Sequence, residues 1–125
     1  MKIFVYGTLK SGYSNNFFME GQKLEGSLET DPEYTLYRVA SFPGLVKAEI
    51  NGISVKGEVW DVDEICLQRL DSFEGHPGLF KRQKINIKGL SNEEVMAYLW
   101  NGDTEDLTPI GNEFKQQPHR NYFRN

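Results

Sequence analysis

The sequence contains a single cysteine, Cys66, so no disulfide can form within the chain. A lone free cysteine is typical of a reducing compartment, and we expect a cytoplasmic protein. No apolar run approaches the roughly twenty residues of a membrane helix. The first residues also lack the basic, apolar and small-residue order of a signal peptide. We therefore expect no membrane partner.

Basic residues are in the minority. Fourteen Lys and Arg stand against eighteen Asp and Glu, which gives a net charge of -4. A mildly acidic surface repels phosphate backbones, so nucleic acid is not an expected partner. The two histidines, His76 and His119, have no partner at metal-ligand spacing and the chain has no Cys pair, so no metal site is predicted.

The 125 residues, 38% of them hydrophobic, suit one core, and we expect a single domain over 1–125. Seven segments have strand character: 2–6, 23–30, 34–39, 44–50, 55–62, 79–88 and 94–100. Six or seven strands with one main helix and short flanking helices predict an α+β fold with a small mixed, mostly antiparallel β-barrel. The pair Asn51-Gly52 predicts a hairpin turn. The polar segment 101–125 is expected to be a loosely packed tail.

One segment predicts a helix that begins after Asp61 or Asp63 as its N-cap and stops at Gly75. Its expected inner face is almost wholly apolar, with one arginine, and comprises Val62, Ile65, Cys66, Arg69, Leu70 and Phe73. Asp71, one turn before Glu74, could form a carboxylate pair with it, but we expect Asp71 to face solvent or to cap a loop. Arg82, Lys84 and Lys88 alternate along a later strand, which is typical of a solvated face.

Two stretches carry candidate chemistry. "YGTLKSG" lacks the spacing of a phosphate loop, because Lys10-Ser11 precede Gly12. The backbone amides of Gly7, Thr8 and Leu9 can form an anion-binding turn, or the stretch is a plain strand exit. Glu74 ends the helix and borders its apolar face. Burial and the negative end of the helix dipole would raise its pKa and favour a proton carrier, and the alternative is a solvated carboxylate.

Three stretches, "FVYGTLKSG", "PGLV" and "LDSFEGHPGLFKR", stand in the chain in that order. Together they resemble the gamma-glutamylcyclotransferase-like superfamily, and most closely its small branch that contains gamma-glutamylamine cyclotransferase. The resemblance runs from Lys2 to about Trp100. It implies a small β-barrel with flanking helices, and an enzyme that releases an amine or amino acid from a γ-glutamyl compound while closing the glutamyl part into 5-oxoproline.

The resemblance also implies residue roles. Tyr6, Gly7, Thr8 and Leu9 correspond to the loop that holds the glutamyl end of the substrate, and Glu74 corresponds to the catalytic carboxylate. Tyr98 stands where an aromatic pocket residue is expected. Phe80-Lys81-Arg82 replaces a Tyr-x-Arg step that is common in the family, so a hydroxyl contact from that position is absent.

A proton shuttle on Glu74 requires no metal or cofactor, and the expected partner is a small-molecule γ-glutamyl substrate. Two alternatives stand beside this interpretation. One is a non-catalytic binding domain on the same fold, because a fold does not fix an activity. The other is an enzyme that removes a γ-glutamyl protecting group in a biosynthetic pathway. The sequence indicates neither the leaving amine nor the oligomeric state.

Overall fold

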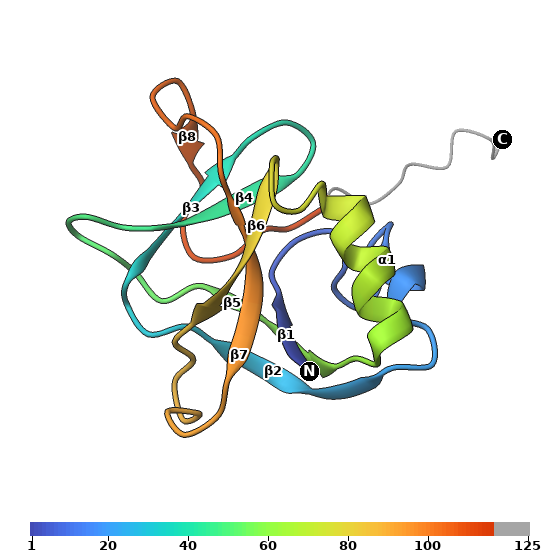
Figure 1. Ribbon diagram of the computed structural model, residues 1–125. Helices are drawn as coiled ribbons and strands as arrows, with labels where there is room; N and C mark the ends of the chain where they lie inside the picture. Colours follow the sequence, from blue (N-terminus) through green and yellow to red (C-terminus); the bar gives the residue numbers. More distant parts are fainter. Residues whose placement is uncertain (117–125) are drawn as a thin grey trace, which may run out of the picture.

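The computed structural model describes residues 1–116 and contains two sheets and one main helix (Figure 1). The larger sheet has the strand order β2-β5-β1-β7-β6, and the smaller sheet has the order β4-β3-β8. The strands are β1 (Lys2–Val5), β2 (Lys23–Glu29), β3 (Tyr34–Arg38), β4 (Pro43–Lys47), β5 (Lys56–Asp61), β6 (Phe80–Ile85), β7 (Val95–Trp100) and β8 (Thr108–Pro109). The helical elements are the 3₁₀ turn η1 (Asn16–Met19) and the helix α1 (Glu64–Glu74).

Strand β1 lies in the middle of the larger sheet and is buried on both faces. It pairs antiparallel with β5 and parallel with β7. Its side chains alternate, so that Ile3 and Val5 join one hydrophobic core while Phe4 and the following Tyr6 join another. This double burial explains why the segment is a continuous apolar run rather than an alternating one.

The larger sheet separates these two cores. On one face its side chains pack against the smaller sheet, through residues such as Leu36 and Leu45. On the other face they pack against α1 and η1, through Met19, Leu67 and Leu70. The molecule is therefore layered as small sheet, large sheet and helices, and the ends of several strands meet the last turn of α1 on the helical side.

The predicted α+β class and the mostly antiparallel pairing are confirmed, since only β1 and β7 pair in parallel among the described residues. The predicted barrel is not confirmed: residues 1–116 form eight strands in two sheets, and neither sheet closes. A physical reason lies at Asp31-Pro32, directly after β2. Proline has no N–H for a sheet ladder, so the chain leaves the larger sheet there and begins the smaller one.

The predicted hairpin at Asn51-Gly52 is wrong. Asn51 has the positive φ of 56° that such a turn uses, but Gly52 does not. The turn brings Ile53 to an isolated bridge with Tyr34, whereas β4 and β5, the strands on either side, belong to different sheets. The local turn signal was therefore correct at one residue and uninformative about strand pairing.

The segment 101–116, expected to be a loosely packed tail, contacts the rest of the fold at a few points. It supplies β8, which pairs with β3, and its Phe114 is only 2% exposed within the core. The Lys10 ammonium is also buried and donates a hydrogen bond to the Phe114 carbonyl (2.8 Å). The expected tail is thus held to the fold at β8 and Phe114, while most other side chains of 101–116 are exposed, and residues 117–125 lie outside the described residues.

Helix α1 has the expected ends. The Asp63 carboxylate accepts a hydrogen bond from the Cys66 N–H (2.8 Å), and Gly75 closes the helix in the left-handed conformation at φ 66°. Its inner face differs from the prediction: Cys66, Leu67 and Leu70 are buried, whereas Ile65 is 72% exposed. Within the described residues no helix is long and apolar enough to cross a membrane.

Candidate active site

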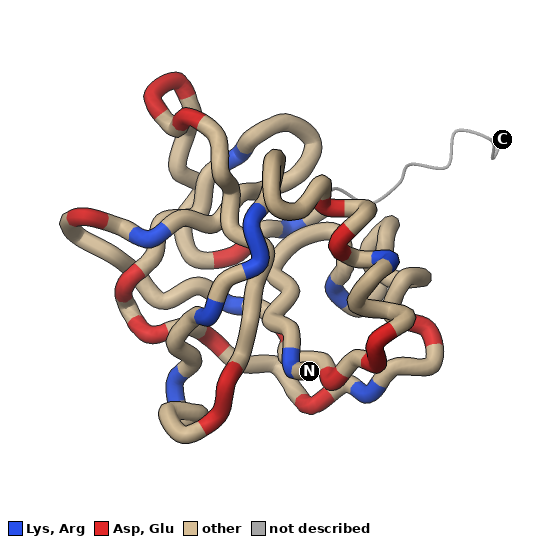
Figure 2. Tube along the Cα trace, viewed as in Figure 1, with Lys and Arg blue, Asp and Glu red and all other residues tan. Residues whose placement is uncertain are grey.

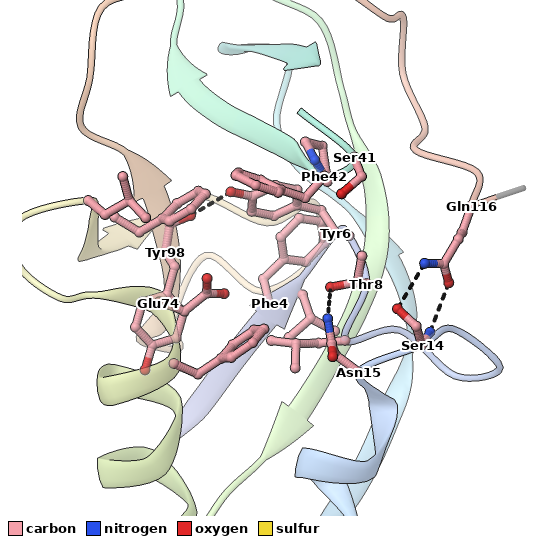
Figure 3. Close-up of a pocket in the computed structure, with 17 residues that line it drawn as sticks. Phe4, Tyr6, Thr8, Ser14, Asn15, Ser41, Phe42, Glu74, Tyr98 and Gln116 are labelled. Carbon is pink, nitrogen blue, oxygen red and sulfur yellow. Dashed lines mark hydrogen bonds between the residues drawn. The ribbon is translucent and has the colours of Figure 1, made fainter. Parts of the chain in front are cut away.

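A pocket of about 310 Å³ opens where the last turn of α1 meets the end of β1 and the start of β4 (Figure 3). Its walls are largely aromatic, and Glu74 is its only acidic or basic side chain among residues 1–116. The lining residues are Phe4, Val5, Tyr6, Gly7, Thr8, Leu9, Ser14, Asn15, Ser41, Phe42, Pro43, Phe73, Glu74, Leu79, Phe80, Tyr98 and Gln116. All the site residues predicted from the sequence are therefore brought together on one pocket.

Glu74 is the last residue of α1, and the Gly75 cap turns the chain away directly after it. Its carboxylate points into the pocket (Figure 3) and makes no hydrogen bond or ion pair with the described residues. Burial without a compensating partner disfavours the ionised form and raises the pKa of Glu74 to about 7. Glu74 can thus both accept and donate a proton near neutral pH.

The turn after β1 presents backbone donors. The N–H groups of Gly7, Thr8 and Leu9 have no acceptor among the residues that the structure describes. Four hydrogen bonds fix the turn itself. Lys10 N–H donates to the Gly7 carbonyl (3.1 Å), Asn15 N–H to the Thr8 carbonyl (2.9 Å), Asn15 Nδ2 to Thr8 Oγ1 (2.8 Å) and Asn16 Nδ2 to the Leu9 carbonyl (2.8 Å). A fixed turn with unused N–H groups has the character of an anion site.

Tyr6 lines the pocket with its ring, but its hydroxyl is used within the fold. The hydroxyl donates to the Tyr98 carbonyl on β7 (2.6 Å) and accepts from the Leu45 N–H on β4 (3.2 Å). Burial, and then the negative charge of Glu74, raise the pKa of this phenol well above its usual range. Tyr6 therefore links the two sheets beside the pocket, and its neutral side chain forms part of the pocket wall.

The Tyr98 hydroxyl also forms a hydrogen bond within the fold, with a partner that the sequence did not predict. It donates to Asp71 Oδ1 (2.6 Å), and the Arg82 guanidinium donates to both Asp71 oxygens (3.1 and 3.2 Å). The expectation that Asp71 faces solvent or caps a loop, and that Arg82 belongs to a solvated face, is wrong. Figure 2 marks the basic residues of β6, which supplies Arg82, and the acidic residues of α1, which supplies Asp71.

Four polar pocket residues, Ser14, Asn15, Ser41 and Gln116, were not predicted. Asn15 and Ser41 come from loops without periodicity, and Gln116 reaches the pocket because its side chain exchanges two hydrogen bonds of 2.8 Å with Ser14. No local sequence signal marks such contacts between distant segments. Among residues 1–116, no group of three His, Cys, Asp or Glu side chains is arranged to hold a metal ion.

Comparison with known proteins links this geometry to one family. The model of the family described as "Gamma-glutamyl cyclotransferase, AIG2-like" matches residues 3–118. A gamma-glutamylcyclotransferase family protein, ytfP, from Citrobacter rodentium is 38% identical over 110 residues, which cover 88% of this chain and 90% of the relative.

Solved structures with a similar fold include a member of the AIG2-like group. An AIG2-like protein from Mus musculus superposes with a TM-score of 0.72 at 26% identity, over 95% of this chain and 97% of the mouse chain. A Kluyveromyces lactis allophanate hydrolase contains the same fold, with a TM-score of 0.75 at 18% identity, over 90% of this chain and 20% of the larger one. The fold thus occurs both alone and as a part of a larger protein.

Proposed function

Because this chain belongs to the gamma-glutamyl cyclotransferase, AIG2-like family, we propose that it converts γ-glutamyl amines or amides into 5-oxoproline and a free amine, with Glu74 as the proton carrier. The observation that carries the proposal is the partly buried Glu74, whose pKa is raised to about 7 and whose carboxylate faces a pocket without a second ionised side chain among the described residues. One titrating side chain is enough for this reaction, because the nucleophile is the α-amine of the substrate and not a group of the protein.

The reaction begins with the α-amine of the substrate. This amine is largely protonated near neutral pH and cannot attack until a base removes a proton. In the proposal, ionised Glu74 takes that proton. The freed nitrogen lone pair then attacks the γ-carbonyl carbon and closes the five-membered ring.

The second half of the reaction returns the proton. The bond between the γ-carbonyl carbon and the leaving nitrogen breaks as the carbonyl re-forms, and the leaving nitrogen takes the proton from Glu74. The ring nitrogen still carries a second proton, which passes through Glu74 to the departing amine. The amine therefore leaves as an ammonium ion, 5-oxoproline remains, and Glu74 is ionised again. A pKa of about 7 suits both steps, because the group is then neither too weak a base nor too weak an acid.

Ring closure also requires the glutamyl chain to be held in a curled form. No Lys or Arg among residues 1–116 lines the pocket, so we assign the α-carboxylate of the substrate to the unused N–H groups of Gly7, Thr8 and Leu9. Fixing this end places the amine near its own carbonyl, and intramolecular reactions with such geometry gain on the order of 10⁵-fold or more in effective molarity.

The test is release of 5-oxoproline from a panel of γ-glutamyl amines, amides and amino acids. We expect turnover of at least the small γ-glutamyl amines, such as γ-glutamyl-methylamine. If no compound in the panel is converted while the protein still binds γ-glutamyl ligands by calorimetry, the chain is a binding domain and the proposal fails.

The pH dependence follows from the pKa of Glu74. Only the ionised form accepts a proton, so kcat/KM should rise about tenfold per pH unit below the pKa and level off above about pH 7. An ordinary carboxyl would already be fully ionised at about pH 6. The measurement is kcat/KM of the native protein from about pH 5 to 8. A flat profile over that range contradicts the assignment.

Gly7 is expected to tolerate no side chain. An added Cβ would lie 2.8 Å from Pro43 Cγ and 2.9 Å from Pro43 Cδ, so Gly7→Ala must displace the turn or β4. A shift of about 1 Å in a substrate-positioning group costs on the order of 10² in kcat/KM. Gly78→Ala is the matched control, because its nearest neighbour would be the Gly75 carbonyl oxygen at 3.7 Å.

A compensating change tests the cause of this loss. Pro43→Ala removes both atoms that the new methyl group would meet, so Gly7→Ala combined with Pro43→Ala should recover much of the activity. If the double variant is as inactive as Gly7→Ala alone, the loss does not arise from the contact with Pro43.

A further inference from the structure

Lys10 is a buried cation in the turn that follows β1. The residue is only 7% exposed, although lysine is almost never buried to this extent without an acidic partner. Its Nζ donates a hydrogen bond to the Phe114 carbonyl (2.8 Å) and lies 4.9 Å from the centroid of the Tyr13 ring. None of the ion pairs formed within residues 1–116 involves Lys10.

Burying this ammonium is unfavourable, and the fold offsets the cost only in part. Burial lowers the pKa of Lys10, and the negative charges of Glu113 and Glu58 oppose this effect without cancelling it. A neutral, unbranched side chain of similar length would fill the same space without a buried charge. A positive charge kept under these conditions is expected to interact with a negative charge that arrives with a ligand.

Lys10 belongs to the same turn that presents unused N–H groups to the pocket. Its own N–H donates to the Gly7 carbonyl (3.1 Å), and its carbonyl accepts from the Tyr13 N–H (3.0 Å). Gly7 and Lys10 thus begin and end one tight turn, in which the first and last Cα atoms lie within about 7 Å of each other. The Lys10 side chain lines a second hollow, together with Ser11 and Tyr13, and not the active-site pocket. The ammonium can therefore act on an anion bound to the turn without touching it.

Coulomb attraction over such a turn is large enough to measure. Two unit charges roughly 10 Å apart change a binding constant by about twofold in water and by about fifteenfold at the effective dielectric constant of a protein. No Lys, Arg or His among residues 1–116 lines the pocket itself, so no cation in its walls masks this effect. We therefore expect an effect between these limits, of about fivefold, on binding of a carboxylate to the turn.

We propose that Lys10 is a positioning residue whose buried ammonium strengthens binding of the substrate α-carboxylate to the N–H groups of Gly7, Thr8 and Leu9, and so selects an anionic glutamyl end. The inference rests on the proposed cyclotransferase function and adds a residue that sets specificity for the acyl part of the substrate. The ammonium attracts the carboxylate equally before and during ring closure, so its effect belongs in KM and not in kcat.

The test compares two substrates that differ only in charge at the α-position. These are γ-glutamyl-methylamine and its α-carboxamide analogue, which cyclises to 5-oxoprolinamide. Lys10→Met should raise KM for the carboxylate substrate about fivefold, while KM for the carboxamide and kcat for both stay near the native values. The intrinsic difference in reactivity between the substrates cancels, because each one is compared between the variant and the native protein.

Matched variants identify the cause as charge. Lys10→Arg keeps the cation and should retain the native preference. Lys56→Met removes an exposed lysine that lines the same second hollow and forms no ion pair within residues 1–116, and it should change neither KM. Lys10→Gln is neutral but keeps an N–H donor for the Phe114 carbonyl, so it replaces Lys10→Met if circular dichroism and thermal melts show that the latter is unfolded.

Each outcome has one meaning. Equal increases in KM for both substrates show that Lys10 only supports the shape of the turn, and they overturn the proposal, as does an unchanged preference. Failure of both neutral variants to fold also assigns Lys10 a structural role and overturns it. Absence of turnover by the native protein removes the proposed function instead. Calorimetry with 5-oxoproline and 5-oxoprolinamide then measures the charge preference without catalysis, and a preference that falls about fivefold in Lys10→Met supports the role of Lys10.

Discussion

Replacing Glu74 by Gln is expected to reduce release of 5-oxoproline by about 10²–10⁴-fold, the range of a lost general acid–base group. The amide keeps the shape of the side chain but neither takes nor returns a proton at this position. The measurement is kcat and kcat/KM with a small γ-glutamyl amine. Glu64→Gln, in the exposed first turn of the same helix, is the matched control and should retain native activity.

The same substitution should stabilise the fold in alkaline solution. The folded state raises the pKa of Glu74 to about 7, so between about pH 4.5 and 7 it binds more protons than the unfolded state. Stability therefore falls as the pH rises through this window, and above it the native protein holds an unfavourable buried charge. The amide that replaces the carboxylate carries no charge, so Glu74→Gln should raise the free energy of unfolding by about 1–3 kcal/mol at pH 8.

This combination separates catalysis from folding. At about pH 4 Glu74 is protonated in both states, so the native protein and Glu74→Gln should unfold with similar free energies. A variant that is inactive but more stable at pH 8 has lost chemistry and not structure. An active Glu74→Gln protein would remove Glu74 from the mechanism, and equal stability at both pH values would mean that its carboxylate is not buried as described.

Asp71→Ala is expected to be the most destabilising change near the pocket. Asp71 pairs bidentately with Arg82 and accepts the Tyr98 hydroxyl at 2.6 Å, and the Arg82 side chain is only 19% exposed. Removing the Asp71 carboxylate leaves the largely buried Arg82 guanidinium and the buried Tyr98 hydroxyl without acceptors. The expected loss in the free energy of unfolding is about 2–4 kcal/mol. The expected fall in the melting temperature is roughly 10 °C.

An exposed ion pair provides the control for this prediction. Asp61→Ala breaks the pair with the N-terminal amine, in which both partners are well exposed, and should cost less than about 1 kcal/mol. If Asp71→Ala and Asp61→Ala are equally mild in thermal and chemical melts, the Asp71–Arg82–Tyr98 contact contributes little to stability. Because Asp71 lies in the last turn before Glu74, we also expect Asp71→Ala to lower activity.

The parts of this structure that sequence predicts well are local. Asp63 and Gly75 bound α1 because a side-chain cap and a left-handed glycine are short-range requirements. The position of Glu74 at the end of that helix follows from the same signals. The apolar run of β1 also identifies its core residues, although it does not indicate that two different cores lie on its two faces.

The parts that sequence does not predict depend on contacts between distant segments. Asp71, Arg82 and Tyr98 come from a helix and two strands, and none of them has a neighbour in the sequence that reveals the others. Ile65 is apolar at a helical spacing and yet exposed, because the position of the sheet decides which stripe of α1 is covered. Phe114 stands in a mostly polar segment with Leu107 and Ile110, and three apolar residues in such a segment do not indicate which of them is buried.

The central place of β1 has a consequence for how the protein is made. β1 leaves the ribosome before the other strands, but its partners β5 and β7 end at Asp61 and Trp100. It therefore lacks one partner until about half of the chain has been synthesised and the other until most of it has. Pairings that join distant segments are intrinsically slow, and an exposed apolar strand is prone to aggregate while it waits. We therefore expect truncated nascent chains that lack β7 to depend on chaperones, and the pocket to form only in a late stage of biosynthesis.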